Sequence, residues 1–418
     1  MAVSDGFRNS GFFCILPWVH ARLNQDGNVY PCCRASEFYP YGSVAKTPFK
    51  EIWNSEAAKT MRLALIRGER LPQCSDCDRI DSMGGFSTRR EMNQRFAHAF
   101  DRVESTAKDG FLDGKLLYLD LRFSNLCNLR CRSCGPQNST AWYSDAQGMT
   151  ESSHAGIIRP FEESKDFWAF FDELLPDLQS IYFAGGEPLL EDMHYELLEK
   201  LLRKGRRETL LTYNTNFSTL SHKQWQAPDL WRNFQNVVVS ASLDGVGEQL
   251  ELLRKGMRWA EVEKNHERLS REAPGVEFRI YSTVTAMNAF HITDAIGRFL
   301  ELGMLRTPAQ LTLNVALGPP YVSLNILNEG DRTLLRERYG SFLASLPGTM
   351  NSALANHIGT ELKRVLGYLA LPVDWKQRER FRRFTFSLDR KRGERFALLF
   401  PEHFELLYNP SGDGSGSE

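Results

Sequence analysis

From Lys115 onward, short apolar runs alternate with longer amphipathic stretches. Six of these runs have the length and apolar content of buried strands. They are Leu117–Phe123, Ile181–Phe183, Thr209–Tyr213, Val237–Leu243, Glu277–Val284 and Leu311–Val315. The stretches between them show helical spacing of apolar residues, as in Met193–Lys204, Gly247–Arg268 and Ile292–Leu302. This alternation predicts parallel βα units, and therefore an α/β fold with a partial (β/α)6 TIM-like barrel.

The segment before the barrel lacks this rhythm and is rich in loops. Arg22–Val29, with the turn Asn-Gln-Asp-Gly, predicts a β-hairpin whose returning strand ends at Cys32. Phe49–Arg67 has helical apolar spacing, and the polar segment around Glu91–Ala107 is also expected to be helical. We therefore expect a small α+β domain before the barrel.

The strand–helix rhythm stops after Asn328. The segments that follow predict helices at Glu329–Leu346, Ala353–Leu371 and Trp375–Leu399, and the Gly/Ser-rich tail is expected to be disordered. The predicted organisation is a small α+β domain at 1–90, a helical linker at 91–114, the barrel at 115–330, a helical region at 331–409 and a tail at 410–418.

Composition and charge narrow the class of protein. Hydrophobic residues make up 42% of the 418 residues and charged residues 25%, which is typical of a globular chain. The net charge of -1 argues against a nucleic-acid partner bound through bulk electrostatics. The apolar run Gly11–Val19 lacks the features of a signal peptide, and the uncharged stretch Thr307–Asn328 carries too many polar residues for lipid. We expect a soluble cytoplasmic protein with no membrane partner.

The eight cysteines are grouped rather than scattered. Five lie in the first 77 residues, three form a tight triplet, and the rest of the chain has none. The first group is Cys14, Cys32, Cys33, Cys74 and Cys77, and the triplet is Cys127, Cys131 and Cys134. Without a secretory signal, such closely spaced thiols indicate metal or cluster ligands rather than disulfides.

The triplet follows the first barrel strand with the spacing CxxxCxxC. Three thiolates from one loop can hold three irons of a 4Fe–4S cluster and leave the fourth open for a small molecule. A zinc site would need a fourth protein ligand, and the loop offers none.

A glycine-rich motif with one carboxylate follows the second strand of the predicted barrel. Gly185, Gly186, Glu187 and Pro188 come after the second strand. Paired glycines allow a ligand to approach the backbone, and a carboxylate accepts hydrogen bonds from an ammonium group. Because active sites of such barrels lie at the carboxyl ends of the strands, we expect a ligand site here.

The cysteine triplet and the Gly-Gly-Glu-Pro motif, in this order, resemble the radical S-adenosylmethionine (SAM) superfamily. The resemblance implies that the open iron chelates SAM. It also implies that one electron cleaves SAM to methionine and a 5′-deoxyadenosyl radical, which abstracts hydrogen from the substrate. An electron donor such as flavodoxin or ferredoxin is then an expected partner.

The resemblance also implies roles for single residues. Glu187, with the backbone of Gly185 and Gly186, would hold the SAM ammonium group. Ser242 matches a ribose contact, and Arg254 is a candidate partner for the SAM carboxylate. Asn214 and Asn216 would face adenosine or substrate, or form only a polar turn. The aromatic residue that the family often has before the third cysteine is replaced by Ser133.

Other polar residues of the barrel have two interpretations. Arg122, Arg130 and Arg132 would offset the negative charge of a cluster, although solvated surface positions are the more common role of arginine. The side chains of Tyr213, Tyr281, Thr283 and Asn314 are candidate acid–base groups, for which packing within the barrel is the favoured alternative.

The N-terminal cysteines resemble the auxiliary-cluster domains called SPASM and twitch. Cys14, Cys32, Cys74 and Cys77 would bind one second 4Fe–4S cluster, in a domain that here precedes the barrel instead of following it. Adjacent side chains of a strand face opposite sides, so Cys32 and Cys33 cannot both bind one cluster. The resemblance favours Cys32, because the family motif places its ligand directly after a Gly-x-x-x-Pro stretch, here Gly27–Pro31. Cys33 is then a buried structural thiol or an alternate ligand. A structural zinc ribbon is the alternative for the whole group.

Three hypotheses of function follow. The first is a radical SAM enzyme that modifies a peptide or protein. The second is a radical SAM dehydrogenase or mutase acting on a small sugar or metabolite. The third is a non-catalytic scaffold that binds an iron–sulfur cluster or zinc.

Overall fold

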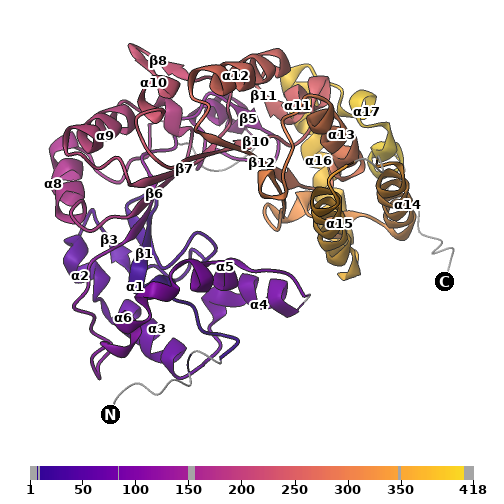
Figure 1. Cartoon of the computed structure of the whole chain (residues 1–418). Helices are drawn as coiled ribbons and strands as arrows, with labels where there is room; N and C mark the ends of the chain where they lie inside the picture. Colours follow the sequence, from indigo (N-terminus) through magenta and orange to yellow (C-terminus); the bar gives the residue numbers. More distant parts are fainter. Residues whose placement is uncertain (1–6, 8–9, 83, 149–155, 347–349, 409–418) are drawn as a thin grey trace. The chain divides into compact units, whose positions relative to one another are not determined.

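The computed structural model describes residues 7, 10–82, 84–148, 156–346 and 350–408 (Figure 1). The chain divides into two compact units. The first comprises residues 1–126, 156–213 and 222–237, and the second comprises residues 127–155, 214–221 and 238–418. The predicted disordered tail at 410–418 lies outside the described residues.

The first unit is built on a mixed sheet in the order β7-β6-β4-β1-β2-β3. The parallel strands are β1 (His20–Leu23), β4 (Tyr118–Arg122), β6 (Ser180–Ala184) and β7 (Leu210–Thr215). The hairpin strand β2 (Asn28–Tyr30) and the short β3 (Gly42–Ser43) extend the sheet in antiparallel fashion. The predicted hairpin therefore joins the barrel sheet through β1, which lies parallel to β4 with His20 opposite Tyr118.

Aromatic side chains fill the core between this sheet and the helices α8 (Ser164–Leu174) and α9 (Asp192–Arg203). The ring of Phe123 lies 5.7 Å from Phe167 of α8, and the ring of Phe183 lies 5.1 Å from His194 of α9. Both helices have the amphipathic pattern that buries one face. This packing fixes the carboxyl ends of β4 and β6, which are paired as far as Arg122 and Ala184.

The helices of the N-terminal segment are shorter than the sequence predicts. The expected helix at Phe49–Arg67 is divided into α2 (Phe49–Trp53) and α3 (Glu56–Ile66), because Ser55 caps α3 by accepting a hydrogen bond from the Ala58 N–H. The expected helix at Glu91–Ala107 is replaced by α5 (Thr88–Arg95), a 3₁₀ turn and α6 (Asp101–Glu104). Ser87 caps α5 in the same way and starts it earlier.

The second unit contains the parallel strands β10 (Val237–Ser242), β12 (Glu277–Val284) and β13 (Leu311–Val315). Its helices α11 (Gly247–Leu253), α12 (Trp259–Glu272) and α13 (Ile292–Glu301) follow the strand–helix order of the sequence. All six predicted barrel strands are therefore present, and the α/β fold class is confirmed. The remaining short elements are α1 (Leu16–Val19), α4 (Ser75–Ser82), β5 (Arg130–Cys131), α7 (Tyr143–Ala146), β8 (Ser221–His222), β9 (Trp225–Gln226), α10 (Ala227–Trp231) and β11 (Arg254–Lys255).

The helix expected at Gly247–Arg268 is interrupted by β11, which pairs antiparallel with β5. The interruption depends on Gly256, whose φ of +103° is unfavourable for other residues. A Cβ atom at this position would also lie 3.0 Å from the Asn128 carbonyl oxygen. The break places Arg254 directly opposite Cys131.

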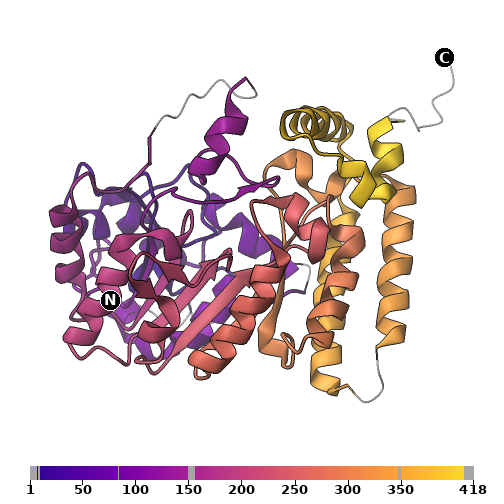
Figure 2. The same ribbon diagram turned by 90° about the horizontal axis from the view of Figure 1, so that it is seen from above.

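The C-terminal helices belong to the second unit and are coloured orange to yellow in Figure 2. They are α14 (Glu329–Ser345), α15 (Ser352–Gly367), α16 (Trp375–Arg392), α17 (Phe396–Leu399) and α18 (Phe404–Tyr408). The predicted helix at Trp375–Leu399 ends at Arg392 because Gly393 adopts the left-handed conformation of a C-cap. Among the helices of the described residues, none combines the length and apolar character needed to cross a lipid bilayer.

We expect Gly256→Ala to destabilise the β5–β11 pair by about 1–3 kcal/mol, since a non-glycine residue at positive φ is strained and has little room here. Urea unfolding, followed by tryptophan fluorescence, measures this effect. Gly275→Ala is the matched control, because a Cβ atom at Gly275 meets no atom within 4 Å. Equal midpoints for the two variants would contradict the role assigned to Gly256.

Candidate functional site

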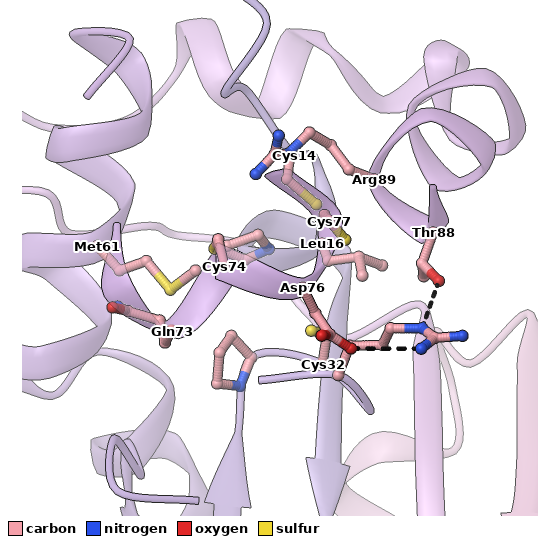
Figure 3. Close-up of a pocket in the computed structure, with 13 residues that line it drawn as sticks. Cys14, Leu16, Cys32, Met61, Gln73, Cys74, Asp76, Cys77, Thr88 and Arg89 are labelled. Carbon is pink, nitrogen blue, oxygen red and sulfur yellow. Dashed lines mark hydrogen bonds and ion pairs between the residues drawn. The ribbon is translucent and has the colours of Figure 1, made fainter. Parts of the chain in front are cut away.

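Four N-terminal cysteines surround one cavity of the first unit (Figure 3). Cys14 precedes α1, Cys32 follows β2, Cys74 ends a 3₁₀ turn, and Cys77 lies on α4. Cys33 does not line this cavity and is exposed. The structure therefore brings together the four cysteines that were predicted as cluster ligands, and it leaves Cys33 outside their cavity.

The segment that carries Cys32 is held by buried polar groups of β1. The Nδ1–H of His20 donates to the Pro31 carbonyl at 2.9 Å, and burial lowers the pKa of His20 to about 4. Arg22 donates to the Cys33 carbonyl at 3.2 Å and lies 4.2 Å from the centre of the Tyr30 ring. Because β1 is anchored on β4, the barrel sheet also positions Cys32.

The cavity is suited to anionic sulfur ligands. Burial raises the pKa of Cys74 to about 11, and Arg89 opposes this rise. Arg89 is itself buried and pairs with Asp78 at 2.5 Å. Arg34, which also lines the cavity, pairs with Asp76 at 3.3 Å. Four thiols with two guanidinium groups beside them fit an iron–sulfur cluster, whose thiolate ligands must remain ionised.

Within the described residues, no three His, Cys, Asp or Glu side chains converge on a position for one metal ion. The four cysteines instead share the wall of a cavity. A four-iron cluster distributes its ligands around its own volume, whereas zinc draws four ligands to one point.

The cysteine triplet lies in the second unit, on a loop that includes β5. Hydrogen-bond donors approach two of its sulfur atoms. The Leu129 N–H lies 3.5 Å from Cys127 Sγ, and Asn216 Nδ2 lies 3.9 Å from it. Burial raises the pKa of Cys131, and Arg254, with Nη1 at 4.0 Å from its sulfur, opposes this rise. These donors favour thiolates, so the loop also fits a cluster.

Arg254 is fixed by an ion pair within the second unit. Its Nε donates to Asp244 Oδ2 at 2.8 Å, while Asp244 Oδ1 accepts a hydrogen bond from the Thr283 N–H at 2.8 Å. Burial disfavours the charge of Arg254, but Asp244 and Cys131 outweigh burial and raise its pKa. The role predicted for Arg254, as a partner of the SAM carboxylate, stays a prediction.

The Gly-Gly-Glu motif lies in the first unit and is bound to the end of β4. The Gly186 N–H donates to the Ser124 carbonyl at 2.9 Å, and the Glu187 N–H donates to the Leu126 carbonyl at 2.7 Å. A Cβ atom at Gly186 would lie 2.2 Å from the Leu126 oxygen, so only glycine fits. Glu187 is buried, and its carboxylate accepts a hydrogen bond from the Leu189 N–H at 3.1 Å.

A buried carboxylate that the sequence did not single out supports this turn. Glu191 accepts a hydrogen bond from the Ser124 hydroxyl, which in turn accepts one from the Leu126 N–H at 2.8 Å. Burial raises the pKa of Glu191. Nothing in the local pattern distinguishes Glu191 from a surface glutamate, since its partner lies 67 residues away.

The other predicted polar residues occupy different surroundings. Asn216 donates to Asn128 Oδ1 at 2.8 Å on the cysteine loop, whereas half-buried Asn214 lies within β7 and half-buried Ser242 ends β10. Tyr213 is buried, and its hydroxyl lies 3.0 Å from His194 Nε2, as expected for a packing role.

The remaining acid–base candidates lie on neighbouring strands. Thr283 of β12 is directly opposite Asn314 of β13, and Tyr281 lies two residues before Thr283. All three are half-buried, in contrast to their fully buried neighbours along the strands. They remain candidates for contact with a ligand.

The interpretation of the loop arginines as surface residues is wrong for Arg132. Its side chain is completely buried, and it pairs with Asp389 of α16 and, at 2.7 Å, with Glu394. Arg130 and Arg392 both pair with Asp145, at 3.1 and 2.8 Å. The C-terminal helices therefore hold the cysteine loop, a role that loop composition does not reveal.

Comparison with protein families agrees with this geometry. Residues 121–294 match the model of the radical SAM superfamily, and residues 14–78 match the SPASM model, an iron–sulfur cluster-binding domain. The chain therefore contains a radical SAM domain, and a SPASM domain precedes it in the sequence. A radical SAM domain binds SAM and a 4Fe–4S cluster, and a SPASM domain binds auxiliary clusters, so the predicted cofactors are confirmed.

Among solved structures, the chain is similar to native anSMEcpe with bound AdoMet, at 21% identity and a TM-score of 0.39. That match covers 55% of this chain and 60% of the other chain, so the chain spans less than two thirds of that protein's length. Streptococcus suis SuiB bound to precursor peptide SuiA is 14% identical with a TM-score of 0.40, covering 80% and 71% of the two chains. No curated protein sequence matches the chain. The sequence identities and TM-scores of these matches are too low to assign a substrate to the chain.

We expect Asp389→Asn to lower the free energy of unfolding by about 1–3 kcal/mol, because the buried Arg132 loses part of its compensating charge. The asparagine can still accept a hydrogen bond from the Phe396 N–H. Urea unfolding measures this loss, and the iron content of the reconstituted protein should fall with it.

Glu379→Gln on the same helix is the matched control. Glu379 pairs with Arg382 and Arg383 near the surface, so its loss should change the free energy of unfolding by no more than about 0.5 kcal/mol. If both variants unfold at the wild-type urea concentration, α16 does not hold the cysteine loop.

Proposed function

We propose that this protein is a radical SAM maturase that modifies a peptide or protein substrate. The observation that carries the proposal is the unequal number of cysteines in its two groups. The barrel loop supplies three cysteines, whereas the N-terminal cavity supplies four. A four-iron cluster on the loop has one iron without a protein ligand, and a cluster in the cavity has none.

When bound at the three-cysteine loop, the reduced cluster supplies the electron that splits SAM into methionine and a 5′-deoxyadenosyl radical, which abstracts hydrogen from the substrate. We assign Cys127, Cys131 and Cys134 as its ligands. Arg254 and the Asn216 amide lie beside two of these sulfurs and offset their negative charge.

The Gly-Gly-Glu turn is proposed to bind the SAM ammonium group. The carbonyl and carboxylate oxygens of this turn accept hydrogen bonds, and glycine at positions 185 and 186 allows the turn to pack closely against Ser124 and Leu126. Glu187 is buried and already ordered by the Leu189 N–H, so the carboxylate loses little freedom on binding. Ser242, Asn214 and Arg254 are proposed to contact the rest of the cofactor.

The N-terminal cavity is proposed to hold the auxiliary 4Fe–4S cluster, with Cys14, Cys32, Cys74 and Cys77 as ligands. Four thiolates leave no iron open, so this cluster would act in electron transfer or substrate positioning rather than in SAM cleavage. Cys33 is exposed and outside the cavity, which supports Cys32 as the ligand. A reduced flavodoxin or ferredoxin is the proposed electron donor. Auxiliary clusters of this type recur in peptide maturases, and this supports a polypeptide substrate.

Replacing Cys127, Cys131 and Cys134 together with alanine should abolish reductive SAM cleavage. The anaerobically reconstituted variant should keep about four irons and four sulfides per chain, from the auxiliary cluster alone. Its absorption and electron paramagnetic resonance spectra should not change on addition of SAM. Formation of 5′-deoxyadenosine by this variant would refute the assignment of the loop.

The complementary variant replaces Cys14, Cys32, Cys74 and Cys77 with alanine. It should keep one cluster whose spectrum responds to SAM, because the loop is untouched. If the variant that lacks Cys127, Cys131 and Cys134 contains one zinc and no labile sulfide, the N-terminal domain is a zinc ribbon and has no redox role.

Glu187→Gln should weaken SAM binding roughly 10- to 100-fold, because a charge-assisted hydrogen bond contributes about 1.5–3 kcal/mol. The glutamine can still accept from the Leu189 N–H, so the turn keeps its shape. Isothermal titration of SAM into the reconstituted protein measures the change. Glu173→Gln, at an exposed position of α8, is the control and should bind SAM like the wild type. Unchanged affinity in Glu187→Gln would show that the carboxylate faces away from SAM.

A further inference from the structure

A cavity of about 680 Å³ in the second unit has no role in the assignments above. Its wall includes Ser133 and Cys134 of the cysteine loop, Pro319 and Tyr321 after β13, and residues of α16. This volume is within the range of pockets that bind small molecules or parts of larger ones. The cavity therefore reaches the third cysteine of the loop from the side formed by the C-terminal helices.

One side of the cavity is an ordered aromatic wall. The Trp142 ring is stacked on Phe384 with centroids 6.4 Å apart, and Phe384 contacts Tyr321 at 4.7 Å. Trp142 is fixed by a hydrogen bond from its Nε1 to the Cys131 carbonyl at 2.8 Å. Such a wall offers apolar contact area without a large loss of side-chain freedom.

The charged residues of the lining are all basic. Arg380 and Arg383 of α16 line the cavity, and none of its lining residues is Asp or Glu. Arg383 is held by Glu379 at 2.7 Å. The Arg380 guanidinium lies 5.1 Å from the centre of the Tyr321 ring. In the part of the chain that the structure describes, Arg380 forms no ion pair with a carboxylate.

The composition of α16 leaves no unpaired carboxylate on this helix for Arg380. The helix has eight basic residues and only two acidic ones. Glu379 is shared by Arg382 and Arg383, and Asp389 is engaged by the buried Arg132. Both carboxylates of the helix are therefore already paired. The excess positive charge at Arg380 favours an anionic ligand.

We propose that this cavity binds a carboxylate of the substrate, an Asp or Glu side chain of a polypeptide, with Arg380 as its partner. This inference rests on the proposed function and names its substrate class. The planar guanidinium can bind a carboxylate through two parallel hydrogen bonds while its other face remains on Tyr321. The aromatic wall takes the apolar part of the neighbouring residue. Binding in this way brings the peptide beside the cysteine loop.

The test compares two fluorescein-labelled random octapeptide libraries that differ at one central position, fixed as Glu in one and Gln in the other. Fluorescence anisotropy measures their binding to the reconstituted full chain with SAM present. The wild type should bind the Glu library roughly tenfold more tightly, the effect of a charge-assisted hydrogen bond at a partly solvated site. Arg380→Gln should remove this preference.

Arg390→Gln is the matched control, since Arg390 is an exposed residue of the same helix that does not line the cavity. This variant should keep both the preference for Glu and the rate of SAM cleavage. Equal or undetectable binding of the two libraries by the wild type would overturn the proposal, as would a preference that survives in Arg380→Gln. A loss of SAM affinity in Arg380→Gln would assign the residue to the cofactor and also overturn it. Absence of SAM cleavage in the wild type would instead refute the proposed function.

Discussion

Buried thiolates need nearby positive charge or hydrogen-bond donors, because burial alone drives the cysteine back to its neutral form. Both cysteine groups meet this condition with arginine. Arg89 opposes the effect of burial on Cys74 in the N-terminal cavity, and Arg254 does so for Cys131 on the barrel loop. Each arginine is in turn held by an aspartate, Asp78 or Asp244. The local structure around each group follows from the need to keep these buried charges paired.

Two tertiary arrangements bring the required residues into place. In the first unit, the parallel pairing of β1 with β4 fixes the hairpin that carries Cys32. In the second unit, α16 and Glu394 hold Arg132 of the cysteine loop through ion pairs that are buried on the arginine side. Breaking such an ion pair leaves an uncompensated charge in the interior, so the contact between Arg132 and the C-terminal region resists local opening. The C-terminal region therefore contributes to the structure of the cysteine loop.

Much of the fold could be predicted because strand and helix periodicities are local properties of the sequence. All six barrel strands were expected, since each is a short apolar run bounded by polar residues. The prediction of one long helix at Gly247–Arg268 was wrong. Its apolar spacing continues across Gly256, but in the structure β11 pairs with β5 there and interrupts the helix. The helix expected at Phe49–Arg67 is divided in two because Ser55 caps its second part. The helix expected at Trp375–Leu399 ends earlier because Gly393 forms a C-cap.

The sequence by itself determined the class of the protein. The spacing of Cys127, Cys131 and Cys134 and the Gly-Gly-Glu motif depend only on residues that are close in the chain, so they can be identified without coordinates. The partners of Arg132, Glu191 and Arg380 are decided by tertiary structure alone. Asp389 lies 257 residues from Arg132, and Ser124 lies 67 residues from Glu191. No local pattern encodes such distant pairs, because whether a charge is buried depends on which elements pack around it.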